Sequence, residues 1–446
     1  MTQSVVRGLL SLDYHVTVLC ARPASHKDEK VVIESNDNVN DMDQHQYLHQ
    51  QQQQRMDDNP NLTVLVIDVP SSTWKKLDRY SCYEHLAEGA LHAFQQKKKE
   101  EDPDHPSVVD DHHDHCPTSF SFDYVFAIDW STIPTIDKLK EHNIITTSST
   151  TTFVFLVFRV FSSSKELCST NDDYTFYTTR EIDAIEKADI TFVLSHVDQK
   201  SLQKIQQLSS STMSSSSSLS TSLSAKPLYV HVPPLRNDFY LKCQSLQSNH
   251  YLTTRAIQQE KKKYILCNVR LSPEKNALLF AKMMKRLSDQ KVLSSLNLTP
   301  IMIGSICDET YAKEVYDTLP PETIIVNKFL NSDELITILT KTALMIHPPL
   351  YDAFGMTIAE GAAIGVPCLI HHENIGASSL FRSEKDEIIE EDLTSPTLLH
   401  KIQCHLASYD KLNKISQNAK LRALSWTVKE YAEGLRSFLD SDEDKN

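Results

Sequence analysis

Glycine is scarce in this chain. It accounts for 8 of 446 residues, although average usage of about 7% would give roughly 31. Five of the eight lie between residues 304 and 376. Because glycine is favoured where the backbone turns tightly or approaches another group closely, we expect such approaches to be concentrated in this region.

Other absences exclude broad classes of protein. No run approaches the roughly 18 apolar residues that span a bilayer, and the first residues lack the pattern of a secretory signal. The 45 basic residues are outnumbered by 59 acidic ones, giving a net charge of -14, so nonspecific binding to nucleic acid is not expected. The nine cysteines contain no CxxC pair, which favours reduced thiols in a cytoplasmic protein. Peripheral contact with a membrane stays open.

Three polar stretches predict disordered insertions, because their composition offers too little apolar surface to offset the entropy of ordering. They cover residues 25–60, 95–117 and 209–224. The second contains His112, His113, His115 and Cys116, whose side chains can bind metals. A solvated tract is the default interpretation of this cluster.

Between these stretches, β-branched runs alternate with helical patterns, which predicts parallel sheets covered by helices on both faces. The expected strands are 16–20, 62–67, 124–128, 190–194, 228–232, 264–268, 300–303, 323–326, 343–347 and 367–371. The expected helices are 74–96, 179–187, 198–208, 273–288, 311–319, 333–342 and 357–364.

Two doubly wound domains follow from this alternation. We place the first at residues 1–250, the second at 251–416, and a final helix with an acidic tail at 417–446. This helix could close its own sheet or cross back to the first domain, and a return to the first domain is the expectation. That helix carries its own start signal, since Thr427 and Glu430 have capping-box spacing, and Trp426 and Tyr431 have the spacing of a hydrophobic staple. Ser332 is the expected N-cap of the helix at 333.

The segment Tyr351–Pro367 is the most informative. Gly355 lies at an expected strand-to-helix turn, where backbone N–H groups and a helix N-terminus suit a phosphate. Glu360, one turn into that helix, could accept hydrogen bonds from the vicinal hydroxyls of a ribose. Asp352 precedes Glu360 by eight positions, with seven residues between them.

A second segment places cations at the same edge of the sheet. Arg270 follows a buried strand, and Lys275 lies in the first turn after Pro273. Open α/β sheets bind ligands at the carboxyl edge of their strands, and two cations beside a helix N-terminus suit a pyrophosphate. Gly304 follows the next strand and so widens the same carboxyl edge of the sheet.

Together these residues resemble the retaining glycosyltransferases of family 4, which have a GT-B fold of two Rossmann-like domains facing across a cleft. The resemblance implies an arginine–lysine phosphate clamp, a ribose-binding glutamate at Glu360 and an acidic residue near the donor sugar at Asp352. It implies catalytic roles for Asp352, Arg270 and Lys275. The implied donor-binding residues are Arg270, Lys275, Gly304, Phe329, Leu330, Phe354, Gly355, Met356, Thr357 and Glu360.

The resemblance also implies the reaction. A sugar would pass from a nucleoside diphosphate sugar to an acceptor hydroxyl with retention, without a metal or other cofactor. In the first half, residues 9–23 are similar to the family's first helix and second strand, so its first strand and glycine-rich loop have no counterpart here. Asp129 is a candidate on the acceptor side or, at equal odds, a helix cap.

Two alternatives remain open. One is a catalytically inactive nucleotide-sugar-binding or regulatory protein, which would bind the donor without turnover. The other is a different GT-B sugar-nucleotide enzyme such as an epimerase, which would share Arg270 and Glu360 but need other acid and base groups. The sequence does not identify the sugar, the base, the acceptor or the oligomeric state.

Overall fold

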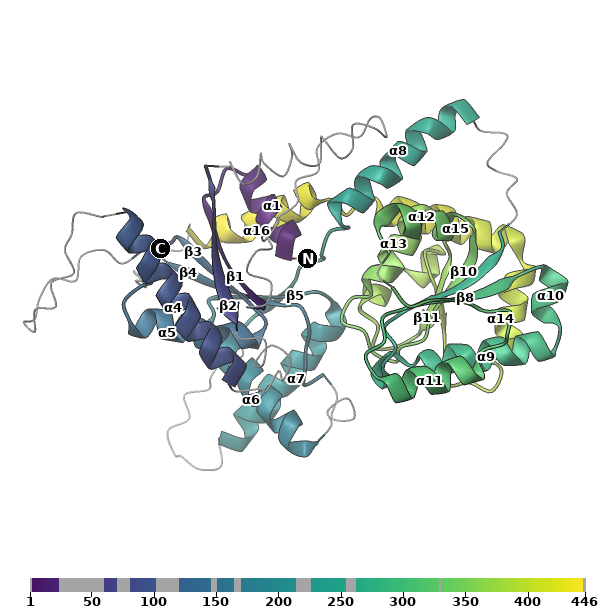
Figure 1. Ribbon diagram of the computed structural model, residues 1–446, viewed down its shortest axis with the longest axis horizontal. Coiled ribbons are helices and arrows are strands. Elements are labelled where there is room, and N and C mark those ends of the chain that lie inside the picture. Colours follow the sequence, from purple (N-terminus) through teal and green to yellow (C-terminus); the bar gives the residue numbers. More distant parts are fainter. Residues whose placement is uncertain are drawn as a thin grey trace, which may run out of the picture. The chain divides into compact units, whose positions relative to one another are not determined.

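The chain divides into two compact units. The computed structural model (Figure 1) describes residues 2–23, 60–69, 81–101, 120–145, 151–163, 170–213, 226–253, 262–328 and 330–443. The N-terminal unit consists of Thr2–Val193 with Leu202–Tyr229, and the C-terminal unit consists of Leu194–Ser201 with the chain from Val230 onward.

The N-terminal unit alternates helices and strands as expected. Its helices are α1 (Thr2–Ser11), α4 (Ser81–Glu101), α5 (Ile133–Glu141), α6 (Asn171–Lys187) and α7 (His196–Met213). Its strands are β1 (Val16–Pro23), β2 (Leu62–Val69), β3 (Tyr124–Ile128), β4 (Thr152–Val157), β5 (Ile190–Val193) and β6 (Leu228–Val230).

The described strands of this unit form two sheets. β1 pairs with β2 in parallel, and a separate four-stranded sheet has the order β3-β4-β5-β6. The expected strands at 16–20, 62–67, 124–128, 190–194 and 228–232 are therefore confirmed. Ala90 and Phe94 of α4 form a core with Leu139 and Ile144, and side chains of both sheets pack against it.

β4 was not predicted, although it lies inside its sheet. Five of its six residues are buried, so the strand has no exposed face and its sequence shows no alternation of apolar and polar residues. α5 was considered only as a helix that Asp129 would cap, and α6 begins eight residues before the expected start at Thr179.

The predicted insertions lie largely outside the described residues, as does the His112–Cys116 tract. Two of the predicted boundaries were wrong, however. α4 continues to Glu101 and α7 to Met213, so the first residues of the stretches at 95 and 209 are helical. Both helices extend into polar sequence in which no apolar stripe marks a helix.

The C-terminal unit follows the predicted scheme closely. Its strands are β7 (Tyr264–Asn268), β8 (Thr299–Ile303), β9 (Ile324–Val326), β10 (Thr342–His347), β11 (Cys368–His371) and β12 (Ile389–Glu391). Its helices are α8 (Asn237–Thr253), α9 (Ala277–Asp289), α10 (Val292–Leu296), α11 (Glu309–Thr318), α12 (Ser332–Thr340), α13 (Met356–Ile364), α14 (Leu398–Ala407), α15 (Tyr409–Ala423) and α16 (Val428–Glu443). The elements α8, α10, α14, α15 and β12 were not predicted.

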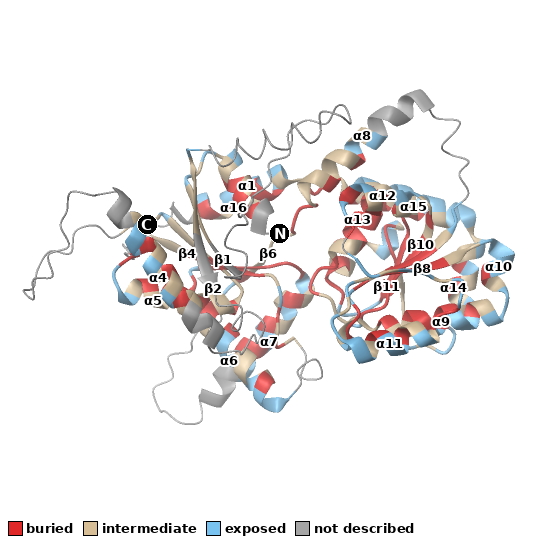
Figure 2. Ribbon diagram, in the orientation of Figure 1, coloured by how far each residue is buried: buried red, intermediate tan, exposed pale blue. Residues whose placement is uncertain are grey.

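These strands form one parallel sheet with the order β12-β11-β10-β7-β8-β9. Figure 1 shows α12 and α13 on one face of this sheet and α9 and α11 on the other. The residues buried on its strands and inner helix faces form the core of the unit (Figure 2). This layering is the doubly wound α/β arrangement that the sequence predicts.

Helix starts show where sequence signals were correct. The capping box of α16 is confirmed, since Glu430 N–H donates to Thr427 Oγ1 at 3.1 Å and Thr427 N–H donates to Glu430 Oε2 at 3.2 Å. The cap predicted at Ser332 was wrong by one residue, because Asn331 and Glu334 form the capping box of α12. Trp426 packs on Phe354 and Phe381, and Tyr431 packs on His231.

Two expectations for the whole chain concerned membrane-spanning helices and cysteine thiols. Within the described residues, no helix combines the length and the apolar character needed to cross a membrane. Among the described cysteines, Cys243, Cys267, Cys307, Cys368 and Cys404 carry free thiols.

Candidate functional site

The predicted donor residues follow the strand ends of the C-terminal sheet. Because all its strands are parallel, the residues after β7, β8, β10 and β11 share one edge. Backbone hydrogen bonds join two of these loops directly. Leu271 N–H donates to Ser305 O at 2.9 Å, and a Cβ at Gly304 would lie 1.9 Å from the carbonyl oxygen of Val269. Only glycine fits there, and it keeps the loop of the exposed Arg270 against the loop after β8.

Lys275 and Asp352 meet although 77 positions separate them in the sequence. Lys275 Nζ lies 3.1 Å from Asp352 Oδ2. The expected helix from Pro273 is in fact a 3-10 turn, Pro273–Lys275, followed by Asn276 in a left-handed conformation before α9. This break turns Lys275 toward Asp352 instead of continuing the helix.

A third residue of this cluster, His347, was missed by the sequence analysis. His347 is the last residue of β10 and is buried, and its Nε2 lies 3.1 Å from Asp352 Oδ2. Its position at a strand end is the signal that could have identified it. Burial alone would raise the pKa of Asp352, but His347 and Lys275 outweigh that effect and hold this pKa well below its ordinary value.

The backbone of Asp352 is held by the loop after β11. Asp352 N–H donates to Asn374 O at 3.1 Å, and Gly376 N–H donates to Asp352 O at 2.8 Å. A Cβ at Gly376 would lie 1.9 Å from the carbonyl oxygen of Ala353, so this close approach also needs a glycine.

α13 begins beside this cluster. Gly355 is its N-cap, with a φ of 86° that favours glycine, and Met356 and Thr357 form the first turn. The first N–H groups of a helix have no partner within the helix, so they can bind an anion. Phe354 is buried against Trp426, with ring centroids 6.1 Å apart, so its ring belongs to the core.

Glu360 lies one turn into α13 and pairs with an arginine that the sequence analysis did not single out. Its side chain is 9% exposed, and Arg236 Nε lies 2.9 Å from its Oε1. Burial raises the pKa of Glu360, and the charge of Arg236 lowers it by less. Arg236 comes directly after the Pro233-Pro234-Leu235 segment. This segment has no periodic pattern, so no sequence signal identified Arg236 as a site residue.

The segment of the implied donor-binding residues Phe329 and Leu330, which by the resemblance would line the base, is only partly described. Phe329 lies outside the described residues, and Leu330 is buried. Lys328 Nζ lies 2.7 Å from Glu334 Oε1, which ties this segment to the first turn of α12.

In the N-terminal unit, Asp129 binds backbone groups of another loop. It lies at the end of β3 with a φ of 55°, and its side chain makes no cap hydrogen bond to the turn that follows. Instead, Oδ1 accepts hydrogen bonds from Phe158 N–H at 2.8 Å and Arg159 N–H at 3.2 Å. Burial raises the pKa of Asp129 to about 6, although both hydrogen bonds lower it.

A second buried carboxyl holds the same loop. Glu181 of α6 accepts a hydrogen bond from Phe161 N–H at 2.6 Å and also binds the Ser162 hydroxyl. Burial raises the pKa of Glu181 to about 7. The Arg159 guanidinium lies 4.9 Å from the centre of the Phe161 ring.

Comparison with known proteins finds one family model, which matches part of the C-terminal unit. Residues 254–422 match the family model of glycosyl transferases group 1. The match includes the loops of Arg270, Lys275, Gly304, Asp352 and Glu360. No curated protein sequence matches the chain.

Several solved structures share the fold of nearly the whole chain. A sucrose-phosphate synthase from Thermosynechococcus elongatus is 11% identical with a TM-score of 0.62, and the match covers 100% of this chain and 92% of that one. The N-terminal domain of a Candida albicans trehalose-6-phosphate phosphatase is 12% identical with a TM-score of 0.58, covering 89% and 87%. A UDP-forming α,α-trehalose-phosphate synthase from Burkholderia xenovorans is 10% identical with a TM-score of 0.57, covering 86% and 87%. These likenesses show the expected GT-B fold.

Proposed function

We propose that the C-terminal unit binds a nucleoside diphosphate sugar and that the protein transfers its sugar to an acceptor hydroxyl. The observation that carries this proposal is the pairing of Lys275 with Asp352 beside the N-terminus of α13. One cation, one carboxylate and free helix N–H groups at a single sheet edge suit a diphosphate and the sugar attached to it. The match of residues 254–422 to glycosyl transferases group 1 supports the same assignment.

The diphosphate would be held mainly by positive charge. Arg270 and Lys275 would neutralise its oxygens, with the N–H groups of Met356 and Thr357 as further donors. Gly304 and Gly355 leave room for these backbone approaches. When the sugar leaves, negative charge grows on the diphosphate, so the same groups stabilise the transition state.

The nucleoside would lie beside α13. Glu360 would accept hydrogen bonds from the ribose hydroxyls, and its ion pair with Arg236 would hold the carboxyl in place. Phe329 and Leu330 would line the base.

The transfer breaks the bond between the anomeric carbon and the diphosphate oxygen and forms one from that carbon to the acceptor oxygen. The acceptor proton passes to the departing diphosphate, so the balance needs no metal, no redox step and no further cofactor. Asp352 would orient the donor sugar, and retention at the anomeric carbon is part of this proposal. Asp129 would act on the acceptor side by positioning the loop of Phe158 and Arg159.

The names of the structural neighbours suggest which compounds to try first. One is called UDP-forming and holds glucose-6-phosphate, and another is a sucrose-phosphate synthase. UDP-glucose as donor and sugar phosphates as acceptors are therefore the first substrates to test, followed by other bases and by lipid, protein and polysaccharide acceptors.

Binding of the donor tests the clamp. We expect UDP, or another nucleoside diphosphate from a panel, to bind the wild type and to bind Lys275→Ala and Arg270→Ala about tenfold or more weakly, since each removes a charge-assisted contact. Lys285→Ala, which removes an exposed lysine of α9, is the matched control and should bind as the wild type does. Unchanged affinity in both clamp variants would remove the clamp from the proposal.

Turnover separates the enzyme from a binding protein. The ion pair of Arg236 with Glu360 favours a binding protein as the second candidate, because an arginine already occupies the carboxyl that would bind ribose. Product formation from donor and acceptor, followed by NMR of the anomeric proton, would establish both transfer and its stereochemistry. Tight binding with neither transfer nor donor hydrolysis across the panel would instead identify a catalytically inactive nucleotide-sugar-binding or regulatory protein.

A further inference from the structure

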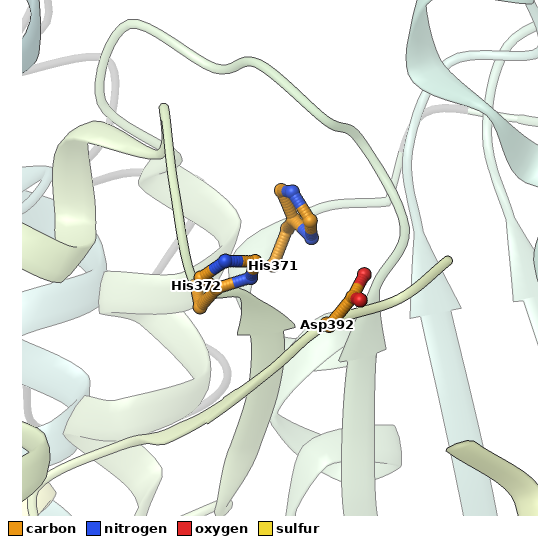
Figure 3. Close-up of side chains that lie close together, drawn as sticks. All are labelled: His371, His372 and Asp392. Carbon is orange, nitrogen blue, oxygen red and sulfur yellow. The ribbon is translucent and has the colours of Figure 1, made fainter. Parts of the chain in front are cut away.

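Two histidines and an aspartate meet where β11 and β12 end. Figure 3 shows His371, His372 and Asp392 at the ends of the two strands, and one ligand atom from each lies within 4.8 Å of the others. β11 and β12 pair in parallel with His371 opposite Glu391. The residues that follow, His372 and Asp392, therefore leave the sheet next to each other.

The backbone around these strand ends sets the orientation of the three side chains. His371 is buried, and its Nδ1 accepts a hydrogen bond from Leu393 N–H at 3.3 Å. The ring centroids of His371 and His372 are 4.6 Å apart. Asp392 Oδ1 accepts hydrogen bonds from the N–H and the hydroxyl of Thr394, at 2.9 and 2.6 Å.

The charges around the cluster favour a cation. A metal ion binds a ring nitrogen that carries no proton, and His371 Nδ1, which accepts the hydrogen bond from Leu393 N–H, is such a nitrogen. Glu373 Oε1 lies 3.5 Å from His372 Nε2, so a second carboxylate adds to the negative charge of Asp392. Two imidazoles and a carboxylate are a common ligand set for Zn²⁺.

We propose that His371, His372 and Asp392 form a binding site for one divalent transition-metal ion of the Zn²⁺ class. Ligands at about 2.1 Å from a tetrahedral Zn²⁺ lie roughly 3.4 Å from one another. His372 is 43% exposed at its side chain, so its ring can turn to close the remaining gap. Three protein ligands leave a fourth position for water.

The ion would act on the loop that holds Asp352. His372 begins this loop, Asn374 accepts a hydrogen bond from Asp352 N–H, and Gly376 N–H donates to Asp352 O. Binding would tie the ends of β11 and β12 together and so restrain the segment from His372 to Gly376. The inference does not depend on the proposed sugar transfer, because the ion stabilises this unit whether or not a donor binds.

The experiment is a titration of the full chain with Zn²⁺ in competition with a chromophoric chelator. The His112–Cys116 tract could bind the same ion, so the background is His112→Ala/His113→Ala/His115→Ala. In that background we expect one tight equivalent of Zn²⁺ and a higher melting temperature with the ion. His372→Ala and Asp392→Asn should each weaken the affinity at least about tenfold.

Both variants change side chains that reach solvent, so the test does not require a change of the buried His371. His142→Ala is the matched control, because it removes an exposed histidine at the end of α5 and should leave the titration unchanged. Co²⁺ should give the absorption of a four-coordinate site in the background protein and lose it in His372→Ala. Equal Zn²⁺ affinity in the background protein, His372→Ala and Asp392→Asn would overturn the proposal, and so would no tight equivalent in the background protein.

Discussion

Asp352 is held by two positively charged or hydrogen-bonding partners from different loops. Lys275 comes from the turn after β7 and His347 from the end of β10, and both reach Oδ2. An aspartate with such partners stays ionised, and its carboxylate keeps one orientation. Both properties suit a group that must meet a sugar hydroxyl in a fixed position.

His347 should stabilise the fold through its contact with Asp352. Changing it to alanine removes a hydrogen bond to a buried carboxylate, so we expect the free energy of unfolding at pH 7 to fall by about 1–3 kcal/mol. The change should also raise the pKa of Asp352 toward its ordinary value. Urea denaturation at several pH values measures both effects.

The sign of the pH dependence follows from the lowered pKa of Asp352. Its pairing stabilises the fold above the unfolded pKa of about 4, and this contribution is lost as the pH falls through the lower folded pKa. The difference between wild type and His347→Ala should therefore shrink below about pH 4. His347→Gln, which keeps an N–H donor, should lose less than His347→Ala. Equal losses in both variants at every pH would show that packing, not the hydrogen bond, is the contribution of His347.

At the scale of elements, two glycines allow a matched comparison. A Cβ at Gly304 would meet the backbone oxygen of Val269 at 1.9 Å, whereas a Cβ at Gly361, inside α13, would meet the end of the Met345 side chain at 2.7 Å. A backbone atom held in a sheet cannot move aside, but the end of a methionine side chain can.

We therefore expect Gly304→Ala to cost about 1–3 kcal/mol of unfolding free energy. Gly361→Ala should change it by less than about 1 kcal/mol, because the gain in helix propensity offsets the crowding. Chemical denaturation of the two variants measures both values. A larger loss in Gly361→Ala than in Gly304→Ala would contradict this interpretation of the loop contact.

The loop after β4 should make stability depend on pH. Glu181 and Asp129 hold its backbone with folded pKa values of about 7 and about 6, raised by burial from 4.5 and 3.8. A raised folded pKa means that the folded protein binds protons more tightly than the unfolded chain. The stability from these two groups is therefore present below about pH 4 and is lost as the pH rises through the folded values.

Glu181→Gln tests this prediction. The variant should lose less stability than the wild type between pH 5 and pH 8, by up to about 3 kcal/mol at about 1.4 kcal/mol per pKa unit. Denaturation at the two pH values gives the slopes. Glu141→Gln, a change of an exposed glutamate on α5, should keep the wild-type slope. A Glu181→Gln slope equal to that of the wild type would show that Glu181 does not titrate in this range.

At the scale of the whole molecule, each unit has its own buried core. Two cores favour unfolding in more than one step. If the C-terminal unit binds the donor, a nucleoside diphosphate at 100 times its Kd should stabilise that unit by about 2.7 kcal/mol. Calorimetry with and without UDP should then show two unfolding transitions, and UDP should raise the temperature of one more than that of the other. Lys275→Ala should reduce the shift, and a nucleotide that binds but moves neither transition would contradict the assignment to this unit.

Much of the C-terminal unit could be predicted because its signals are local. Short β-branched runs, a proline near a helix start and glycines at turns mark β7 to β11 and the helices between them, apart from the short α10. β12 was not predicted, because a strand of three residues is too short to show periodicity. In the N-terminal unit, β4 was not predicted for a different reason. It is buried on both faces, so its sequence lacks the alternation of apolar and polar residues that identifies a strand.

The sequence alone determined the fold class and the strand ends that carry the candidate residues, because these depend on periodicity and turn chemistry within a few neighbouring residues. The GT-B architecture was expected only from the resemblance to the glycosyltransferases of family 4. Only the tertiary structure decided the partners of those residues: His347 and Lys275 for Asp352, Arg236 for Glu360, and two backbone N–H groups for Asp129. These contacts join residues far apart in the chain. Their existence depends on strand order and register, which no local pattern encodes.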